Sequence, residues 1–403
     1  MPEGSAAKPR RRARASGGGA PRAVIDDVLI VGAGPAGSVA AAVLARAGAR
    51  VRLFDRATFP REKLCGDTVN PGTLAVLRRL DLAASIEERG LRVDGMRVTG
   101  EHGVAIEGRY PRDLSGRALM RRDLDWALLQ QAIAAGAQFE AGAAVRRALG
   151  DRRGVAGVAI GGHGSLHEVR ARVTIAADGR HSTMAFGLGV ARHPERPRRW
   201  AIGAYYGNVA GVTTLGEMHI RRGRYIGVAA VPGGLTNVCV VRPSRPGDAA
   251  LRDRVALLQH ELARDSELRH RFADARLVQP PVMLGPLAVE VTGAAIDGLL
   301  LAGDATGFID PMTGDGMRFA VRGAELAAGA ALDALEHGWT GVHHRLAERR
   351  RAEFAGKWRF NRILRGLVGS PRAVEAATLG ARVAPGVLRA MIAHAGDCSV
   401  ADR

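Results

Sequence analysis

The sequence predicts an α/β fold: a Rossmann-like, mostly parallel nucleotide-binding sheet, a smaller and mainly antiparallel β-sheet domain, and C-terminal helices. Residues 27–55 give, in order, an apolar strand, a glycine-rich turn, an Ala-rich helix and a second apolar strand. Residues 193–279 instead give short strands separated by Gly, Pro and Asn turns, followed by a helical stretch. A chain of 403 residues is long enough to form both domains.

The glycine-rich turn is the most specific local pattern. Residues 28–31 are apolar, and Gly32, Gly34 and Gly37 follow in G-x-G-x-x-G spacing. The first glycine suits a tight turn, the second a close approach of pyrophosphate, and the third close packing of helix on strand. Asp55 ends the second strand, where a carboxylate accepts a hydrogen bond from a ribose 2′-OH. The pattern predicts a site for an adenine dinucleotide but does not distinguish FAD from NAD.

Composition limits the partners of the chain. The formal net charge is +18, but Arg supplies nearly all of the positive charge and aromatic residues make up only 4%. With so few aromatic side chains available for stacking we expect no nucleic acid, whereas peripheral contact with an anionic membrane surface is compatible with the Arg-rich segments. Three dispersed cysteines, Cys65, Cys239 and Cys398, fit a reducing cytoplasm.

Targeting segments and metal sites are not indicated. Residues 1–22 are basic and rich in Gly, Pro and Ala, which predicts a disordered tail without a secretory signal. No stretch resembles a transmembrane span. The histidines at 193, 219, 260 and 270 lack metal-ligand spacing, so no metal is expected.

Two segments between the first strands and the second sheet are ambiguous when read alone. Cys65, Gly66, Asp67 and Thr68 bring a thiol and a carboxylate together in one loop, for which a buried structural cysteine is the simpler interpretation. Arg121 precedes an amphipathic helix over residues 123–135, and alone it reads as a surface arginine.

Later strand ends carry two more candidate motifs. A hairpin over residues 155–175 leads to Asp178 and Gly179, which alone indicate a turn. The apolar strand 299–302 ends at Gly303 and Asp304, and ligands of open α/β sheets bind at such carboxyl ends. A glycine-rich turn ending at Gly316 then leads into an Ala-rich helix near Met317, whose N-terminus would stabilise negative charge.

Three further elements are expected from periodicity. Residues 139–145 read as one strand and residues 249–272 as an amphipathic helical stretch. In the Arg-rich C-terminal part, Phe354, Trp358, Ile363 and Leu367 are predicted to share one helix face, and a docking helix is favoured over a membrane anchor.

Taken together, the glycine turn at Gly32, the Asp178-Gly179 pair and the Gly303-Asp304 pair resemble the FAD-dependent oxidoreductases typified by para-hydroxybenzoate hydroxylase, with a glutathione reductase-type FAD-binding domain. Within them, REKLCGDTVNPG and FIDPMTGDGMRFA look like the geranylgeranyl reductase branch, which reduces isoprenoid double bonds in lipids and quinones. The resemblance covers the chain from Val24 to about Leu335.

The resemblance implies specific cofactor contacts. The flavin contacts of that family carry over onto Ala36, Asp55, Cys65, Gly66, Thr68, Arg121, Val145, Asp304, Gly316 and Met317. It implies that Cys65 lies close to the isoalloxazine, where it is the candidate catalytic residue, and that Asp304 contacts the ribityl chain. In this light Arg121 and the Cys65 loop belong to the cofactor site.

The sequence also departs from the family patterns. Ala185 stands where the hydroxylases usually carry Arg three residues after the serine at 182. The segment 225–232 keeps Tyr225 and Pro232 but lacks the Trp and Phe usual in the reductase branch, so a wider pocket is expected. The Trp-x-Trp-x-Ile-Pro signature of flavin halogenases is absent.

The expected division is a tail (1–23), an FAD-binding domain in two parts (24–190 and 286–335), a substrate domain (191–285) and a C-terminal helical region (336–403). The first functional hypothesis is an FAD enzyme that reduces C=C bonds of an apolar isoprenoid or quinone-type lipid, with NAD(P)H or another donor as reductant. The alternatives are a flavin monooxygenase acting on a phenolic or polyketide lipid, and a basic binding protein with an idle nucleotide fold.

Overall fold

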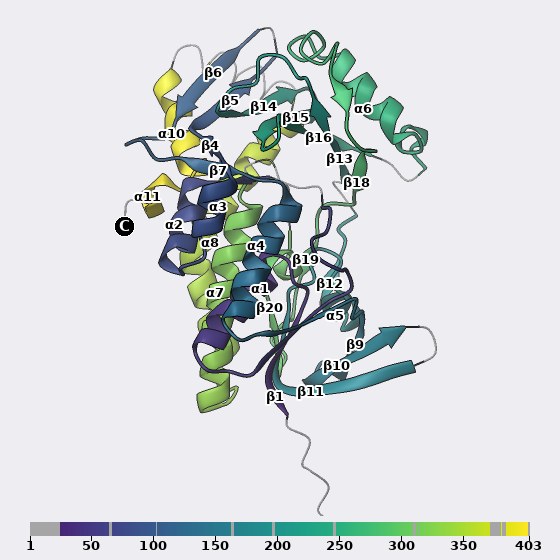
Figure 1. Cartoon of the computed structure of the whole chain (residues 1–403), viewed down its shortest axis with the longest axis vertical. Helices are drawn as coiled ribbons and strands as arrows, with labels where there is room; N and C mark the ends of the chain where they lie inside the picture. Colours follow the sequence, from purple (N-terminus) through teal and green to yellow (C-terminus); the bar gives the residue numbers. More distant parts are fainter. Residues whose placement is uncertain are drawn as a thin grey trace, which may run out of the picture.

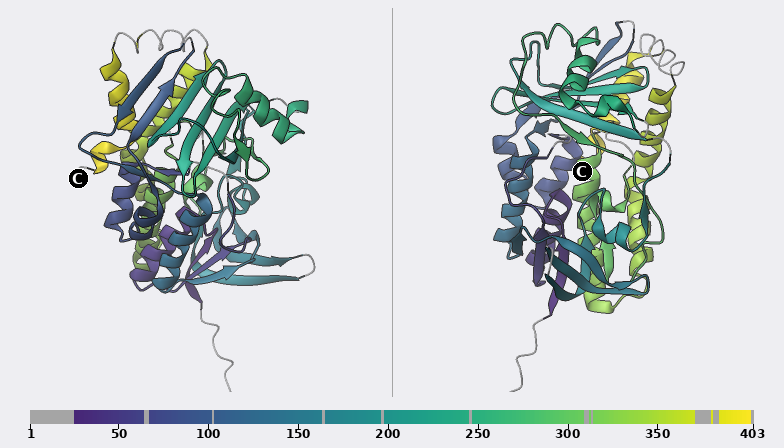
Figure 2. Two further views of the ribbon diagram at one scale, coloured as in Figure 1. Left: turned by 45° about the horizontal axis from the view of Figure 1, so that its top comes forward. Right: turned by 90° about the vertical axis from the view of Figure 1, so that its right-hand side faces the viewer.

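The computed structural model describes residues 25–63, 67–101, 103–162, 165–195, 198–244, 247–308, 312, 314–370, 380 and 384–401. Two large sheets dominate the chain, one in the lower half of Figure 1 and one in the upper half. Long helices run beside the lower sheet, and the long helix α8 (Val342–Gly369) extends from it toward the upper sheet (Figure 2). The predicted α/β fold class is confirmed.

The first sheet is a parallel core with an antiparallel extension. Its strands follow the order β8, β2, β1, β11, β10, β9, and β20 also pairs with β11. The neighbours β8–β2, β2–β1, β1–β11 and β11–β20 are parallel, whereas β10 is antiparallel to β9 and β11. Their bounds are β1 (Asp26–Val31), β2 (Val51–Asp55), β8 (Gln138–Ala141), β9 (Val145–Asp151), β10 (Gly154–Gly162), β11 (Ser165–Ala176) and β20 (Leu299–Leu301).

Helices rich in small residues cover one face of this sheet. They are α1 (Pro35–Arg46), α4 (Arg121–Ala134) and α7 (Gly316–His337), and α1 contacts both of the others. Helices α1 and α7 contribute mainly alanines to the core on this face, where Val28, Ile30 and Leu53 are completely buried. The opposite face packs Leu29, Val31 and Phe54 against the short helix α5 (Thr183–Gly187) and its neighbours.

The second sheet is strongly twisted and mostly antiparallel. Its order is β17, β13, β16, β15, β14, β5, β6, and β18 also pairs with β13. The bounds are β5 (Gly95–Thr99), β6 (Ala105–Arg109), β13 (Arg199–Gly207), β14 (Leu215–Arg221), β15 (Arg224–Val231), β16 (Leu235–Pro243), β17 (Arg276–Leu277) and β18 (Val282–Leu284). Helix α6 (Arg254–Ala263) buries Leu257, Leu258 and Leu262 on one face. The other face is turned toward the first sheet and its helices (Figure 1).

Small elements connect the two layers. A three-stranded sheet of β3 (Thr68–Val69), β7 (Gly116–Ala118) and β4 (Leu91–Val93) and a pair β12 (Ala191–Arg192) and β19 (Glu290–Val291) lie between them. The helices here are α2 (Pro71–Arg79) and α3 (Ala84–Arg89). Of the 3₁₀ turns, η1 (Ala249–Leu251) lies beside α6 and η2 (Gly303–Thr306) lies beside α7. The chain ends with α10 (Pro385–Ala395) and α11 (Cys398–Ala401).

Some expectations from periodicity were wrong in their bounds. The segment 139–145 is two strands, because Gly142 has φ +72° and turns the chain between β8 and β9. The stretch 249–272 contains only η1 and the ten residues of α6 as helix, since Asp253 caps α6 and turns follow Ala263. Ile363 is 66% exposed and does not share the buried face of Phe354.

The pairing also bears on the predicted division of the chain. Residues 95–109, which the sequence assigns to the first part of the FAD-binding domain, add β5 and β6 to the second sheet. The predicted tail lies outside the described residues. Among the described helices, none has the length and apolarity to cross a bilayer.

Candidate active site

The glycine turn between β1 and α1 has a separate steric reason at each glycine. Gly32 has φ +97°, and a Cβ there would lie 2.6 Å from the carbonyl oxygen of Ala177. A Cβ on Gly37 would lie 1.8 Å from the carbonyl oxygen of Gly32, so the helix can approach the turn only without a side chain. At Gly34 the nearest described atom is Nη2 of Arg61, 3.5 Å away. Gly34 therefore borders the space that a diphosphate requires.

The start of α1 is suited to an anion. Gly34 is its N-cap, no side chain caps its first N–H groups, and its first turn holds no acidic residue. Free amides and the helix dipole together favour a phosphate at this end. A Cβ on Gly303 would lie 2.8 Å from the Cβ of Ala36, so η2 is packed directly against this helix start. Two motifs far apart in the sequence thus form one surface.

The Asp55 carboxylate lies at the carboxyl end of β2, beside the glycine turn. Oδ2 accepts a hydrogen bond from the backbone N–H of Ala33 at 2.9 Å, and Oδ1 accepts one from Ala57 at 2.9 Å. Each ionised carboxylate oxygen can accept a second bond, so Asp55 retains capacity for a ribose hydroxyl.

Cationic groups surround Asp304 at the start of η2. Burial raises the pKa of Asp304, while Lys63, Arg121 and Arg180 act in the opposite direction. Burial, followed by the charge of Arg121, lowers the pKa of Lys63. A carboxylate, an ammonium and guanidinium groups therefore share one region, which can bind both the hydroxyls and the phosphates of a dinucleotide.

Arg121 is fixed at the first position of α4 by a buried carboxylate. Its Nε and Nη2 donate to the two oxygens of Asp125 at 2.8 and 3.0 Å, and Arg121 is only 4% exposed. Nη1 of Arg61 lies 3.1 Å from Asp125 Oδ2. The structure therefore corrects the interpretation of Arg121 as a surface arginine, because its guanidinium is buried and oriented.

The Asp178-Gly179 pair lies against the glycine turn. A Cβ on Gly32 would come within 2.8 Å of the Cα of Asp178. Oδ2 of Asp178 accepts from the backbone N–H of Thr183 at 2.7 Å, and Ser182 caps α5 through the N–H of Ala185 at 3.1 Å. Burial raises the pKa of Asp178. This pair holds the β11–α5 connection beside the nucleotide turn.

The remaining predicted contacts that the structure describes are spread over three elements, β3, β9 and α7. Thr68 is on β3, paired with Ala118, and Val145 begins β9 with its side chain in the core cluster of Leu29. Gly316 begins α7, and a Cβ there would touch no described atom within 4 Å. Met317 is 8% exposed in the first turn of α7. Cys65 and Gly66 lie outside the described residues.

The face of the second sheet that looks toward this site carries small residues at its centre. Tyr205 and Asn237 both reach Asp67, so the positions two residues away, Gly203 and Cys239, share their face. Cys239 is paired with Gly203 on one side and with Gly227 on the other. A Cβ on Gly227 would meet, among described atoms, only backbone oxygens at 3.9 and 4.0 Å. This row of small residues, Gly203, Cys239 and Gly227, leaves room for a flat or apolar group.

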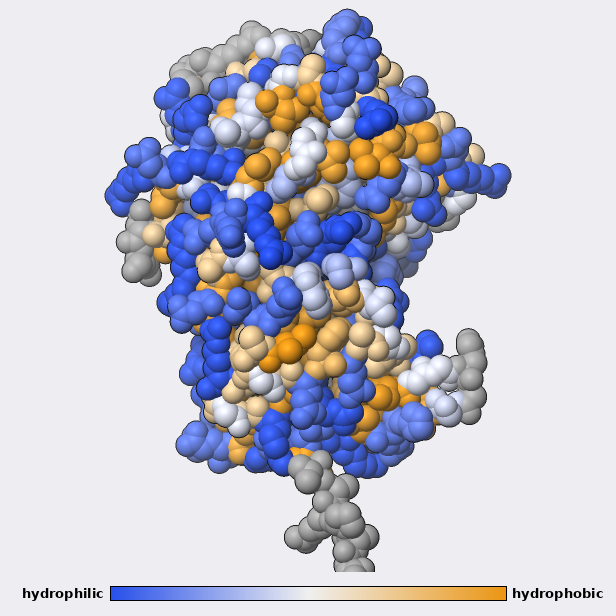
Figure 3. Space-filling model, in the orientation of Figure 1, coloured by the Kyte–Doolittle hydropathy of each residue, from blue (hydrophilic) through white to orange (hydrophobic). Residues whose placement is uncertain are grey.

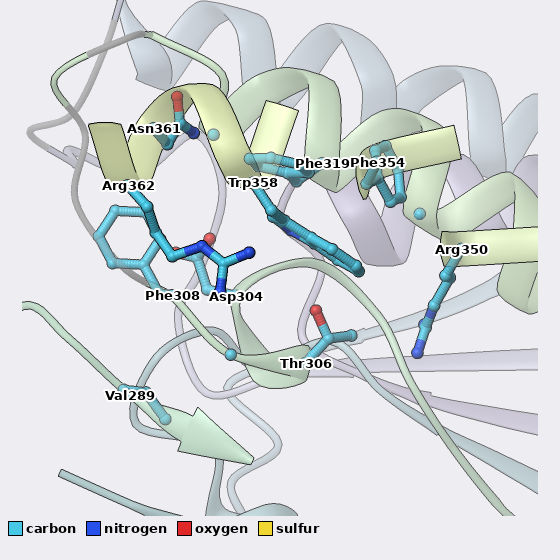
Figure 4. A pocket seen from close by; sticks show the side chains of 13 residues that line it. Val289, Asp304, Thr306, Phe308, Phe319, Arg350, Phe354, Trp358, Asn361 and Arg362 are labelled. Atoms are coloured by element: carbon cyan, nitrogen blue, oxygen red, sulfur yellow. The ribbon is translucent and has the colours of Figure 1, made fainter. Parts of the chain in front are cut away.

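A pocket of about 280 Å³ opens beside η2 and the start of α7. Figure 4 shows Trp358, Phe319 and Phe354 on one side and Thr306 and Phe308 on the other, with Arg350 and Arg362 at its ends. Asp304 and Gly316 are also in its wall. Burial lowers the pKa of Arg350 to about 10. The pocket is aromatic and apolar with cationic ends, and it borders the predicted flavin site.

Sequence reasoning missed a buried ionic network behind α7. Nζ of Lys357 lies 3.1 Å from Asp315 Oδ1 and 3.1 Å from Asp397 Oδ1, and Nε of Arg318 lies 3.1 Å from Asp397 Oδ2. Arg318 also pairs with Glu353. The network ties α10 and α11 to the start of α7. No local pattern in the sequence marks Lys357, because its partners Asp315 and Asp397 are 42 and 40 residues away along the chain.

Comparison with known proteins identifies the family. The model of a family described as FAD binding domain matches residues 26–357. The chain belongs to this family. It is therefore an FAD-dependent oxidoreductase, and the predicted cofactor FAD is confirmed at this level.

Curated relatives fall among reductases. The chain is similar to menaquinone reductase of Mycolicibacterium smegmatis, with 32% identity over 325 residues and 75% of each chain covered. It is also similar to digeranylgeranylglycerophospholipid reductase 2 of Methanopyrus kandleri, with 32% identity over 328 residues, 77% of this chain and 78% of the relative. The predicted resemblance to the geranylgeranyl reductase branch is confirmed.

Solved structures share the fold. A geranylgeranyl bacteriochlorophyll reductase-like protein of Thermoplasma acidophilum superimposes with a TM-score of 0.74 at 22% identity over 88% of this chain and 95% of that chain. The flavin-dependent brominase Bmp2 gives a TM-score of 0.80 at 21% identity, covering 93% of this chain and 94% of that chain. Both kinds of enzyme therefore use this architecture, and the fold alone does not select between them.

Proposed function

We propose that this FAD-dependent oxidoreductase reduces C=C bonds of an apolar isoprenoid or quinone-type lipid. The observation that carries the proposal is the aromatic and apolar pocket whose wall includes Asp304 and Gly316, because it brings an apolar substrate to the predicted flavin site. The names of the curated relatives, menaquinone reductase and digeranylgeranylglycerophospholipid reductase, support the same substrate class.

In this proposal each predicted residue has a part in holding the cofactor. The glycine turn and the start of α1 bind the diphosphate, Asp55 the ribose, and Asp304 the ribityl chain, while Arg121 supplies positive charge. The full proposed set is Gly32, Gly34, Ala36, Gly37, Asp55, Cys65, Gly66, Thr68, Arg121, Val145, Asp178, Gly303, Asp304, Gly316 and Met317. FAD, when bound and reduced, supplies the hydride. The N-terminus of α7 stabilises negative charge beside it.

The test of the proposal is a single anaerobic turnover. The purified protein is loaded with FAD, reduced chemically without oxygen and mixed with a short-chain isoprenoid quinone while the flavin absorbance is followed. Reoxidation that depends on the quinone's side-chain double bonds supports the proposal. Controls with the saturated side chain separate it from simple electron transfer to the quinone ring. Reoxidation only by oxygen, coupled to hydroxylation of a phenolic lipid, supports the monooxygenase alternative.

Cys65 is proposed as the catalytic residue closest to the isoalloxazine. In the sequence it lies between Lys63, whose pKa is lowered by burial and by the charge of Arg121, and Asp67, which accepts a hydrogen bond from the backbone N–H of Arg121. We expect Cys65→Ala to retain FAD and to slow turnover. Cys398→Ala is the matched control, since Cys398 is buried in α11. If Cys65→Ala turns over as fast as the wild type, Cys65 has a packing role and no catalytic one.

The electron donor is proposed to be NAD(P)H or another two-electron reductant. Anaerobic addition of NADPH to the FAD-loaded protein distinguishes them. Rapid bleaching of the flavin identifies direct nicotinamide reduction. Persistent oxidised flavin points to another donor, such as a ferredoxin or a reduced quinone.

Peripheral membrane contact is proposed for the C-terminal helices. Ile363 on α8 and Val387 on α10 are 66% and 62% exposed, and the exposed Arg359 and Arg362 lie on α8. On the face in Figure 3, apolar patches also lie over the second sheet, above a band of hydrophilic residues. Exposed apolar side chains beside arginines suit an anionic lipid surface. We expect the protein to co-sediment with phosphatidylglycerol vesicles but not with phosphatidylcholine vesicles. We also expect Ile363→Ser to reduce this co-sedimentation.

A further inference from the structure

A guanidinium in the wall of the pocket beside η2 lacks a counter-ion. Arg350 lines this pocket, and its Nη2 donates to the carbonyl oxygen of Leu301 at the end of β20. In the described part of the chain, no carboxylate forms an ion pair with Arg350. Burial alone lowers its pKa to about 10. Because an enclosed cation without a negative partner is costly, Arg350 is suited to bind an anion that enters the pocket.

The carboxylate of Asp304, in the same wall, does not take this place. The cations that act on the pKa of Asp304 are Lys63, Arg121 and Arg180, and Arg350 is not among them. Asp304 is therefore directed toward the cofactor side of η2, whereas Arg350 borders the pocket on the side of α8. The charge of Arg350 remains available to a ligand.

The opposite end of the pocket holds two more polar side chains, which differ in exposure. Arg362 is exposed, so water solvates its charge without a ligand. Asn361 is only 8% exposed, and among the residues that the structure describes its Oδ1 has no hydrogen-bond partner. Buried polar atoms of folded proteins are nearly always hydrogen-bonded. Arg350 and Asn361 therefore indicate a ligand that carries polar atoms and is not a purely apolar chain.

The wall side chains of α8 form one row along the pocket (Figure 4). Arg350, Phe354, Trp358 and Asn361 are spaced by three or four residues, which places them on one face of the helix. The row extends over roughly 17 Å of the helix axis. It presents a cation, then two aromatic rings, and then an amide. This order suits a lipid chain with an anionic head at the Arg350 end.

The Arg350 end is remote from the start of α7, where the flavin is proposed to lie. Helices α7 and α8 run antiparallel, because Asp315 pairs with Lys357 and Asp333 pairs with Arg345. Arg350 therefore lies beside a later turn of α7 than its first one. An anionic head at Arg350 leaves the aromatic part of the pocket and the start of α7 to the isoprenoid chain.

We propose that Arg350 binds the anionic head group, a phosphate or a carboxylate, of a single-chain isoprenoid substrate and makes the enzyme prefer it to a neutral lipid. The proposal rests on the proposed function, because it takes this pocket as the substrate site. Hydrogen bonds from a guanidinium to an anionic oxygen are about twice as strong as those to a neutral one, so a quinone carbonyl would bind the same donors more weakly. The volume of about 280 Å³ favours one chain over the two chains of a phospholipid.

The test is the affinity of the oxidised, FAD-loaded protein for three probes, measured by titration calorimetry. The probes are farnesyl phosphate, farnesol and inorganic phosphate. The wild type is expected to bind farnesyl phosphate roughly 30-fold more tightly than either of the others, or better. Arg350→Gln is expected to lose this preference and to bind farnesol as the wild type does. Arg350→Lys should keep only part of it, because the charge remains and the paired donors are lost.

The matched control is Arg349→Gln. Arg349 is the exposed neighbour of Arg350 on α8 and does not line the pocket, so this variant removes the same charge outside the site. It is expected to bind all three probes as the wild type does. The flavin absorbance of each variant shows whether it has folded and retained FAD. If Arg350→Gln does not fold, Arg350→Lys and the comparison of probes on the wild type decide.

Four results would overturn the assignment. The first is equal affinity of the wild type for farnesyl phosphate and farnesol, and the second is unchanged affinity of Arg350→Gln for farnesyl phosphate. The third is inorganic phosphate that binds as tightly as farnesyl phosphate, which would mark a site for the free anion. The fourth is displacement of farnesyl phosphate by an equal concentration of NADPH, which would assign the pocket to the electron donor.

The proposed function is tested separately by anaerobic reoxidation of the reduced protein. If farnesyl phosphate binds through Arg350 and no isoprenoid reoxidises the flavin, the anion site is correct and the proposed reaction is wrong. If isoprenoids reoxidise the flavin equally fast in the wild type and in Arg350→Gln, the reaction is correct and the role of Arg350 is wrong.

Discussion

The nucleotide turn and the contact zone between the two sheets are built on different principles. In the turn, Gly32, Gly34 and Gly37 lie within six residues, and each answers a steric demand of the local backbone. In the contact zone, Asp67 bonds to Tyr205 and Asn237, which are 138 and 170 residues away. The first kind of site can be predicted from the spacing of residues in the sequence, whereas the second forms only when the two sheets pack together.

The strongest way to break the local site is to add one methyl group at Gly37. The Cβ of Gly37→Ala would overlap the carbonyl oxygen of Gly32, which is backbone and cannot move aside. We expect a loss on the order of 4 kcal/mol or more in the free energy of unfolding, together with loss of FAD. Gly329→Ala on α7 is the control, because no described atom lies within 4 Å of its Cβ. Urea unfolding measures both, and equal stability of the two variants would contradict the steric account.

The contact zone should reveal itself through pH. The pKa of Asp67 is raised in the folded protein from 3.8 to about 7, so its ionisation opposes folding. This contribution to stability is fully present below pH 4 and is lost as the pH rises through about 7, by roughly 4 kcal/mol in total. Asp67→Asn should therefore flatten the stability curve between pH 4 and 7 in urea titrations. Parallel curves for wild type and variant would show that Asp67 is ionised throughout.

A third change weakens the network that secures the C-terminal helices. Lys357→Met removes the ammonium between Asp315 and Asp397 and leaves two buried carboxylates without it. We expect a loss of about 3 kcal/mol in the free energy of unfolding. The exposed pair Arg78–Glu87 gives the comparison, and Arg78→Met should cost no more than about 1 kcal/mol. Similar losses for both variants would remove the distinction between buried and surface pairs.

The smallest expected effect concerns cofactor retention alone. Asp304→Ala should leave the fold intact and weaken FAD binding roughly tenfold or more, about 1.4 kcal/mol, because the proposed ribityl acceptor is lost. Glu336→Ala, an exposed carboxylate on α7, is the control and should bind FAD as the wild type does. Equilibrium titration of FAD followed by flavin fluorescence measures both. If Asp304→Ala binds FAD as tightly as the wild type, the assignment of Asp304 to the ribityl chain is wrong.

The same contrast between local and tertiary sites explains which parts of the molecule could be predicted from the sequence. The β1–α1–β2 unit and the strand leading to Gly303 and Asp304 were predicted because short-range periodicity and glycine spacing determine them. Arg121 needed a family resemblance, since nothing local shows that Asp125 pairs with it in a buried site. Asp67, Asn237 and Lys357 could not be assigned, because the partners of a buried polar group are known only from the tertiary structure.

Element bounds were missed for a related reason. The helix expected to reach Phe272 ends at Ala263, because Asp265 accepts from the N–H groups of Glu267 and Leu268 and pairs with Arg221. The helical periodicity of the sequence cannot show that a turn held by a distant arginine ends the helix here. Likewise, β5 and β6 join the second sheet through pairing with β14, a contact across more than a hundred residues of chain.

The most direct test of the central claim is the mass of the product. The FAD-loaded protein, a two-electron reductant and an isoprenoid quinone are incubated without oxygen, and the lipid is analysed by mass spectrometry. We predict a product that is heavier by two hydrogen atoms and stays so after the quinone ring is reoxidised in air. A product that forms only under oxygen and is heavier by one oxygen atom would contradict this prediction and identify a monooxygenase.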